Sequence, residues 1–95
     1  MTEKNKMIAG QLYRSGDDLL RNERKRARRL LKVFNGTLPD EIERRVVMLR
    51  KLLGALGQQV EIEPPFYCDY GYNISIGDNF YANFNCIILD CAKVI

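Results

Sequence analysis

Histidine and tryptophan are absent from this 95-residue sequence, and prolines and cysteines number only three each. Without histidine, the chain lacks the usual general base at neutral pH, and it cannot form Ser-His or Cys-His nucleophile pairs. A zinc site also loses its common nitrogen ligand. We therefore expect no catalytic residue in this sequence that could act as a general base, and no bound metal.

The sequence has an odd number of cysteines, and no two of them have C-x-x-C spacing; they are Cys68, Cys86 and Cys91. This pattern indicates reduced thiols with mainly structural roles. The alternative is that Cys91 acts as a nucleophile and carries an acyl group. We disfavour it because no histidine is present to generate the thiolate.

Long apolar runs are also missing, and residues 2–6 are all polar or charged. These features predict neither a secretory signal nor a membrane-spanning helix. The hydrophobic fraction of 46% and the charged fraction of 28% are close to those of ordinary folded proteins, which argues against disorder. We expect one small folded protein located in the cytoplasm.

Positive charge is concentrated in one segment, although the formal net charge is only +3. Residues 21–32 carry seven basic side chains and a single acid, Glu23. Such a run is typical either of a solvated helix face or of a contact with nucleic acid or an acidic partner. No aromatic residues interleave with the basic ones for base stacking, so we favour the solvated face and do not expect nucleic acid as a partner.

The first half of the sequence has helical character. Apolar spacing predicts a short helix over residues 2–13, with Gly10 weakening its middle. Ser15, three residues before Asp18, resembles a capping box. We therefore expect a second helix over residues 17–34, capped by Ser15.

The second helix is expected to stop at Asn35-Gly36 through a left-handed residue. Residues 37–41, with a proline in the first turn and two acids, are expected to open a third helix. Its buried stripe is predicted to consist of Ile42, Val46, Leu49 and Leu53. Residues 1–57 thus form a helical domain whose apolar faces need a partner.

After Gln58 a period of six residues replaces the helical period. One apolar set with this spacing comprises Ile62, Cys68, Ile74, Phe80, Cys86 and Ala92, and a second comprises Ile76, Ala82, Ile88 and Val94. A six-residue repeat is typical of a β-helix, in which each flat side returns the same position to the interior. The fold class is therefore α+β, with a helical domain followed at residues 58–95 by the first coils of a parallel β-helix.

Ile76-Gly77-Asp78-Asn79-Phe80 follows the hexapeptide motif of acyltransferases, apart from the bulky Phe80 at a small position. The run from Ile62 to Asn85, IEPPFYCDYGYNISIGDNFYANFN, and the opening segment 3–13 are similar to the maltose and galactoside O-acetyltransferases. The resemblance covers essentially the whole chain. It implies a left-handed β-helix that continues beyond Ile95, so we expect a truncated form without the family's catalytic histidine.

The resemblance also implies an activity, the transfer of an acetyl group from acetyl-CoA to a sugar hydroxyl of the maltose, glucose or galactoside class. No metal is implied, and a homotrimer is expected at full length. The 95-residue chain itself is expected to be inactive. The alternatives are a non-catalytic fragment, or a module that binds nucleic acid or an acidic partner through its basic helix.

Five residues match polar acceptor-site positions of the family and are expected to bind the sugar: Asp17, Asp69, Tyr81, Asn83 and Asp90. Carboxylates suit this role because they accept strong hydrogen bonds from paired hydroxyls. The structural alternatives are a helix cap for Asp17 and turn roles for Asp69 and Asn83. Whether Asp90 or Cys91 occupies the family's carboxylate position stays open.

Overall fold

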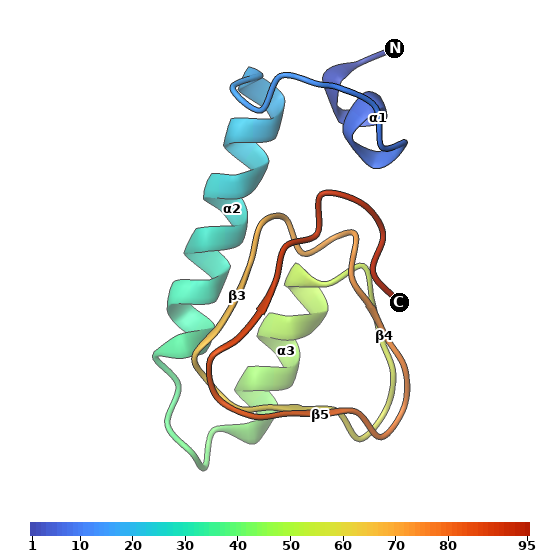
Figure 1. Cartoon of the computed structure of the whole chain (residues 1–95). Helices are drawn as coiled ribbons and strands as arrows, with labels where there is room; N and C mark the ends of the chain where they lie inside the picture. The colour runs from blue at the N-terminus through green and yellow to red at the C-terminus, as the bar shows by residue number, and fades with distance from the viewer.

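The computed structural model describes all residues from Met1 to Ile95. Three helices come first: α1 (Glu3–Ile8), α2 (Asp18–Asn35) and α3 (Ile42–Leu52). Six short strands follow: β1 (Ala55–Leu56), β2 (Glu61–Ile62), β3 (Phe66–Cys68), β4 (Ser75–Ile76), β5 (Tyr81–Ala82) and β6 (Cys86–Ile88). From β1 onward the chain winds along a roughly triangular path with strands on its sides (Figure 1).

Each strand of the first coil pairs in parallel with a strand of the second coil. The pairs are β1 with β4, β2 with β5, and β3 with β6. Partners lie twenty residues apart, as in Leu56 with Ile76 and Ile62 with Ala82. The prediction of short strands joined by turns is therefore confirmed, and residues 66–95 contain no helix. The pairing of β1 already starts the coils at Ala55.

The two six-residue sets fill the interior of successive coils. Ile62, Cys68 and Ile74 are buried in the first coil. In the second, Ala82 is buried, while Ile76, Ile88 and Val94 are partly buried against the same core. One coil takes twenty residues, which is two more than three repeats of six. The positions that point inward therefore move by two residues at the start of the second coil, from Ile74 to Ile76. The first set therefore does not continue unchanged, and its last member, Ala92, is exposed.

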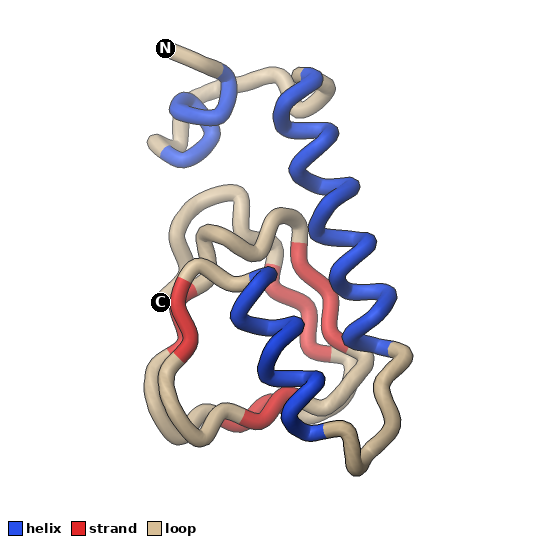
Figure 2. The backbone as a smooth tube through the Cα atoms, turned by 180° about the vertical axis from the view of Figure 1, so that it is seen from behind, coloured by secondary structure: helices blue, strands red, loops and turns tan.

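Helices and coils share one hydrophobic core. Leu31 and Phe34 of α2 and Leu49 of α3 pack together with buried residues of the first coil. The Phe34 ring meets the Phe66 ring edge-on, at a centroid distance of 6.5 Å. Viewed from behind, α3 lies across the open end of the first coil (Figure 2). The helical part thus covers apolar surface that one coil cannot bury by itself.

Two helix boundaries differ from those expected. α1 ends at Ile8, because Gly10 has φ of +77° and turns the chain out of the helix. α2 is capped by Asp17 and not by Ser15: the Asp17 Oδ2 accepts a hydrogen bond from the Leu20 N–H at 3.3 Å. Asp17 stands directly before the first helical residue, Asp18, and its carboxylate therefore reaches a free amide of the first turn.

The end of α2 and the start of α3 also differ from expectation. Gly36 has φ of −89°, so the helix does not stop through a left-handed residue. Instead the Thr37 hydroxyl and N–H both donate to the Phe34 carbonyl. α3 begins at Ile42, whose side chain is 62% exposed and thus lies outside the expected buried stripe. The buried side chains at the end of α3 belong to Met48, Leu49 and Leu52.

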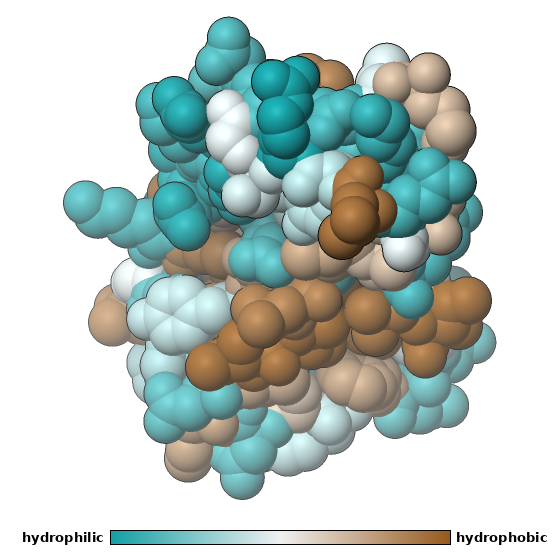
Figure 3. All heavy atoms as spheres, turned by 45° about the horizontal axis from the view of Figure 1, so that its top comes forward, coloured by the Kyte–Doolittle hydropathy of each residue, from teal (hydrophilic) through white to brown (hydrophobic).

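Large apolar side chains are exposed on the outside of the second coil. They are Tyr81, Phe84, Ile87 and Leu89, each more than half exposed. On the face turned forward in Figure 3, apolar side chains gather in a band below a more polar upper part. None of the three helices combines the length and apolarity needed to cross a membrane.

Candidate functional site

The carboxylate of Asp90 is the anchor of a tight loop formed by residues 69–73. Its side chain is completely buried, and it accepts hydrogen bonds from four backbone N–H groups. Oδ1 is bound by the amides of Asp69 and Tyr70 at 3.1 and 2.8 Å, and Oδ2 by those of Gly71 and Asn73 at 2.7 and 3.2 Å. Because both oxygens are occupied and shielded, Asp90 presents no free oxygen at the surface.

Two further contacts hold this loop in place. The Asn73 side-chain amide donates to the Asp90 carbonyl at 2.7 Å, so Asn73 donates to both the side chain and the backbone of Asp90. Gly71 has φ of +89° and lies against Leu52, where a β-carbon would come within 2.5 Å of the Leu52 carbonyl oxygen. Only glycine combines this conformation with so close an approach. The loop backbone, and with it the position of Asp69, is therefore well defined.

A small polar cluster lies beside the loop, where the N-terminal segment meets the second coil. The Cys91 thiol donates to Asp69 Oδ2 at a separation of 3.5 Å, and the Tyr13 hydroxyl donates to Cys91 Sγ at 3.6 Å. This hydrogen bond, together with burial, raises the pKa of Tyr13 to about 12. Tyr13 thus keeps its proton, which it donates to Cys91, at physiological pH.

Two tyrosines of the loop connect it to α2. The Arg24 guanidinium donates to the Tyr70 hydroxyl at 2.8 Å, and the Tyr72 hydroxyl donates to Glu23 at 3.0 Å. Burial raises the pKa of both tyrosines, and for Tyr72 the neighbouring Glu23 carboxylate raises it further. Glu23 also pairs with Lys4 at 3.0 Å. The helical domain and the coils are therefore held together by polar as well as apolar contacts on this side.

The structure places the five predicted residues in three regions. Asp69 and Asp90 lie together at the loop, and Asp17 caps the nearby start of α2, with its carboxylate bonded to Leu20. Tyr81, which is 57% exposed, belongs to β5 at the opposite edge of the coil, and Asn83 follows it (Figure 1). The Asn83 Oδ1 accepts only from the next backbone amide, that of Phe84 at 2.8 Å.

Two further residues, Tyr13 and Asn73, belong to the loop cluster and were not predicted from the sequence. Both lie far in sequence from their partners, and no spacing signal connects them to Asp69 or Asp90. The side chains of Asp90 and Cys91 point to different surroundings. The Cys91 side chain faces the Tyr13–Asp69 cluster, whereas the Asp90 side chain faces the loop amides.

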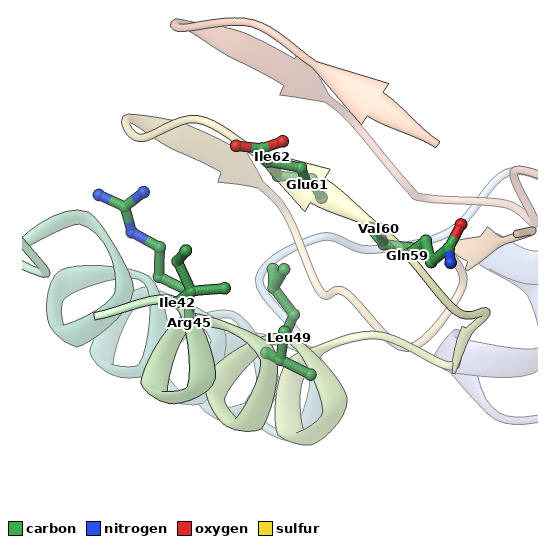
Figure 4. Close-up of a pocket in the computed structure, with 8 residues that line it drawn as sticks. Ile42, Arg45, Leu49, Gln59, Val60, Glu61 and Ile62 are labelled. Atoms are coloured by element: carbon green, nitrogen blue, oxygen red, sulfur yellow. The ribbon is translucent and has the colours of Figure 1, made fainter. Parts of the chain in front are cut away.

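A separate cavity of about 260 Å³ lies between α3 and β2 (Figure 4). Its lining is mostly apolar and includes Ile42, Leu49, Val60 and Ile62. Arg45 at its edge already donates to the Thr37 hydroxyl at 2.8 Å. None of the predicted site residues lines this cavity, and it contains no pair suited to acid/base or nucleophilic chemistry.

Comparison with known proteins identifies relatives along the full chain. The family model of the maltose acetyltransferase hexapeptide capping motif matches residues 6–57. Nodulation protein L of Rhizobium meliloti is 48% identical over 93 residues, which cover 98% of this chain and 51% of that protein.

Solved structures agree with the sequence comparison. A maltose O-acetyltransferase from Clostridium difficile 630 matches with a TM-score of 0.96 and 49% identity, over 98% of this chain and 50% of that one. A galactoside acetyltransferase in complex with coenzyme A matches with a TM-score of 0.90 and 36% identity, over 98% of this chain and 46% of that one. The chain thus spans about half the length of the relatives it matches.

These matches confirm the resemblance seen in residues 62–85 and in the N-terminal segment. The family model covers more than half of the chain, and the short parallel strands and six-residue sets have the form that hexapeptide repeats require. The chain belongs to the maltose acetyltransferase family of hexapeptide-repeat acetyltransferases.

Proposed function

We propose that this chain provides the acceptor-binding half of an acetyl-CoA-dependent sugar O-acetyltransferase. The observation that carries the proposal is the match to a maltose O-acetyltransferase at a TM-score of 0.96 over 98% of the chain. The relative in complex with coenzyme A supports acetyl-CoA as the donor. The acceptor is a sugar hydroxyl of the maltose, glucose or galactoside class.

The chemistry is direct attack of a sugar hydroxyl on the thioester, with a general base removing the hydroxyl proton. The sequence contains no histidine, so residues outside these 95 supply the base. The contribution of this chain is to hold the sugar in line for attack, which lowers the entropic part of the barrier. No step of this reaction requires a metal ion.

Asp17, Asp69, Tyr81 and Asn83 are proposed as sugar contacts, and Asp90 is proposed to act indirectly. Its four amide contacts fix the loop that carries Asp69, so it serves as a positioning residue. Asp69 follows β3 in the first coil, whereas Asn83 follows β5 in the second coil, on a different side of the triangular path. A homotrimer of left-handed β-helices in the cytoplasm, with sites between neighbouring subunits, would allow both to contact one sugar.

The test is a chimera in which residues 1–95 replace the matching half of the Clostridium difficile maltose O-acetyltransferase. Release of coenzyme A is measured with maltose, glucose and a galactoside. Asn83→Ala is expected to lower kcat/KM for the sugar by about tenfold, with KM for acetyl-CoA unchanged, because an acceptor contact worth roughly 1–3 kcal/mol is lost. Asn22→Ala makes the same chemical change on an exposed face of α2 and serves as the matched control.

The isolated 95-residue chain is expected to release no coenzyme A above background in the same assay. A positioned general base typically contributes about 10²–10⁴ in rate, and this chain has no histidine to provide it. Turnover by the isolated chain would show that the base has been misassigned. A chimera that folds but acetylates none of the three sugars would contradict the proposed acceptor class.

A further inference from the structure

Four basic side chains of α2 have no partner in the folded chain. Three other arginines of this helix are used internally: Arg21 and Arg26 donate to backbone carbonyls, and Arg24 donates to Tyr70 and to Ser15. Glu23, the only acid in the basic run, forms an ion pair with Lys4 and accepts a hydrogen bond from Tyr72. The side chains that form no hydrogen bond or ion pair are those of Lys25, Arg28, Arg29 and Lys32.

These four residues lie on one face of the helix, because their spacing is i, i+3, i+4 and i+7. All four are exposed. Their positive charges are neither neutralised by neighbouring acids nor consumed by the fold, so this face carries a positive potential that attracts anions.

A groove of about 510 Å³ begins at the lower end of this face, between α2 and β3. Arg28 and Lys32 line one side of it, and Tyr67 of β3, which is 49% exposed, lines the other. α2 and β3 run beside each other in both backbone views (Figures 1 and 2). Residues 21–32 contain no aromatic side chain, but the fold places the Tyr67 ring beside them.

The other lining residues are Leu31, Asn35 and Gly36, and none of the lining residues is acidic. The Asn35 amide is fully engaged with the backbone of Phe66, at 3.0 Å as donor and 2.8 Å as acceptor. The groove thus offers a guanidinium and an ammonium that can donate to phosphate oxygens, and beside them the ring of Tyr67 as an aromatic face.

We propose that this groove is a binding site for a nucleoside phosphate. Arg28 and Lys32 bind the phosphate oxygens, with arginine providing the planar fork that matches phosphate geometry. The base lies against the exposed ring of Tyr67. The site is distinct from the residues proposed to bind the sugar.

A single nucleotide fits this groove better than a nucleic acid strand does. Strand-binding proteins stack successive bases on several aromatic side chains, and the groove offers one. Its volume lies within the range typical of small-molecule sites. The inference does not depend on the proposed acetyl transfer, because it is tested by binding alone.

The test is a titration of the isotope-labelled 95-residue chain with adenosine diphosphate, inorganic phosphate or adenosine, followed by two-dimensional NMR. We expect adenosine diphosphate to bind saturably and more tightly than either part alone, with signals of Arg28, Lys32 and Tyr67 shifting. The double variant R28Q/K32Q should weaken binding by about tenfold or more, since charge-assisted contacts are lost.

The matched control is K25Q/R29Q, which removes the same charge from the same helix but leaves the groove lining intact. It should weaken binding less than about threefold, through long-range electrostatics alone. Tyr67→Leu should weaken binding of adenosine diphosphate and leave that of inorganic phosphate unchanged. Equal losses in the two double variants would overturn the proposal, as would non-saturable binding. Much tighter binding of single-stranded RNA would overturn it in favour of a nucleic-acid contact.

Discussion

At the residue scale, the side chain of Asp90 organises the loop that carries Asp69. A buried carboxylate is costly unless its oxygens are hydrogen-bonded, and here four backbone amides satisfy it. The same bonds give the amides of the 69–73 loop the partners that they would otherwise lack. Asp90 therefore fixes the backbone of the loop that carries Asp69, the residue to which Cys91 donates.

Asp90→Asn is expected to destabilise the chain by about 3 kcal/mol or more. The amide retains one acceptor oxygen and places an NH₂ group against backbone donors, so buried N–H groups lose their partner. Asp69→Asn, which alters a partly exposed carboxylate with one thiol contact, should cost less than about 1 kcal/mol. Urea unfolding of both variants measures the difference, and similar midpoints for the two would contradict the anchoring role.

Cys68 gives a second residue-scale prediction, on pH. Burial, reinforced by the charges of Asp90 and Asp69, raises the pKa of this thiol to about 12 from an ordinary value of 9.0. Below pH 9 the thiol is neutral in both folded and unfolded chains. Between about pH 9 and 12 the unfolded chain loses the proton and the folded chain keeps it, so stability falls as pH rises.

The measurement is the free energy of unfolding at several pH values in this window, for the natural chain and for Cys68→Ala. The variant should be less stable at pH 7, because a buried side chain is truncated, yet its stability should decline less steeply above pH 9. Tyr13, Tyr70 and Tyr72 also have raised pKa values, so part of the decline should remain. Cys86→Ala is the control, and an unchanged slope in Cys68→Ala would refute the assignment.

At the element scale, features that depend on local sequence patterns could be predicted, whereas contacts between distant parts of the chain could not. The six-residue sets identified the inward side chains of both coils, because each side of the coil repeats the same environment. The phase shift between Ile74 and Ile76 was not predictable, since it arises from a twenty-residue register that only strand pairing reveals. For the same reason the Tyr13–Cys91–Asp69 cluster and the Asp90 anchor were invisible: their members are brought together by the fold.

Helix ends were the least predictable elements, and α2 provides a direct test. Ser15 and Asp17 both have suitable side chains for a cap, but only Asp17 accepts a hydrogen bond from the first turn. Asp17→Ala should therefore destabilise the chain by about 1 kcal/mol. Ser15→Ala should change stability by less than about 0.5 kcal/mol. Thermal unfolding of the two variants decides between them, and a larger loss in Ser15→Ala would restore the capping box.

At the scale of the whole molecule, the two ends of the coil stack differ, because helices cover only one of them. α3 and the end of α2 cover the first coil and share a buried apolar core with it. The strands of the second coil, β4, β5 and β6, each have only one partner strand. The outer apolar residues Ile87 and Leu89 are 62% and 68% exposed beside those free edges. Free edges combined with exposed apolar side chains favour association.

The 95-residue chain is therefore expected to self-associate, and the double variant Ile87→Lys, Leu89→Lys should reduce this association. Charged side chains beside an open strand edge oppose edge-to-edge pairing and remove two exposed apolar side chains. The control is Leu12→Lys, at a side chain that is 97% exposed in the N-terminal segment, away from the coils. Light scattering over a range of concentrations measures the mean mass. If the natural chain remains monomeric throughout, or if Leu12→Lys reduces association as much as the coil variant, then the outer face of the second coil is not the surface through which copies meet.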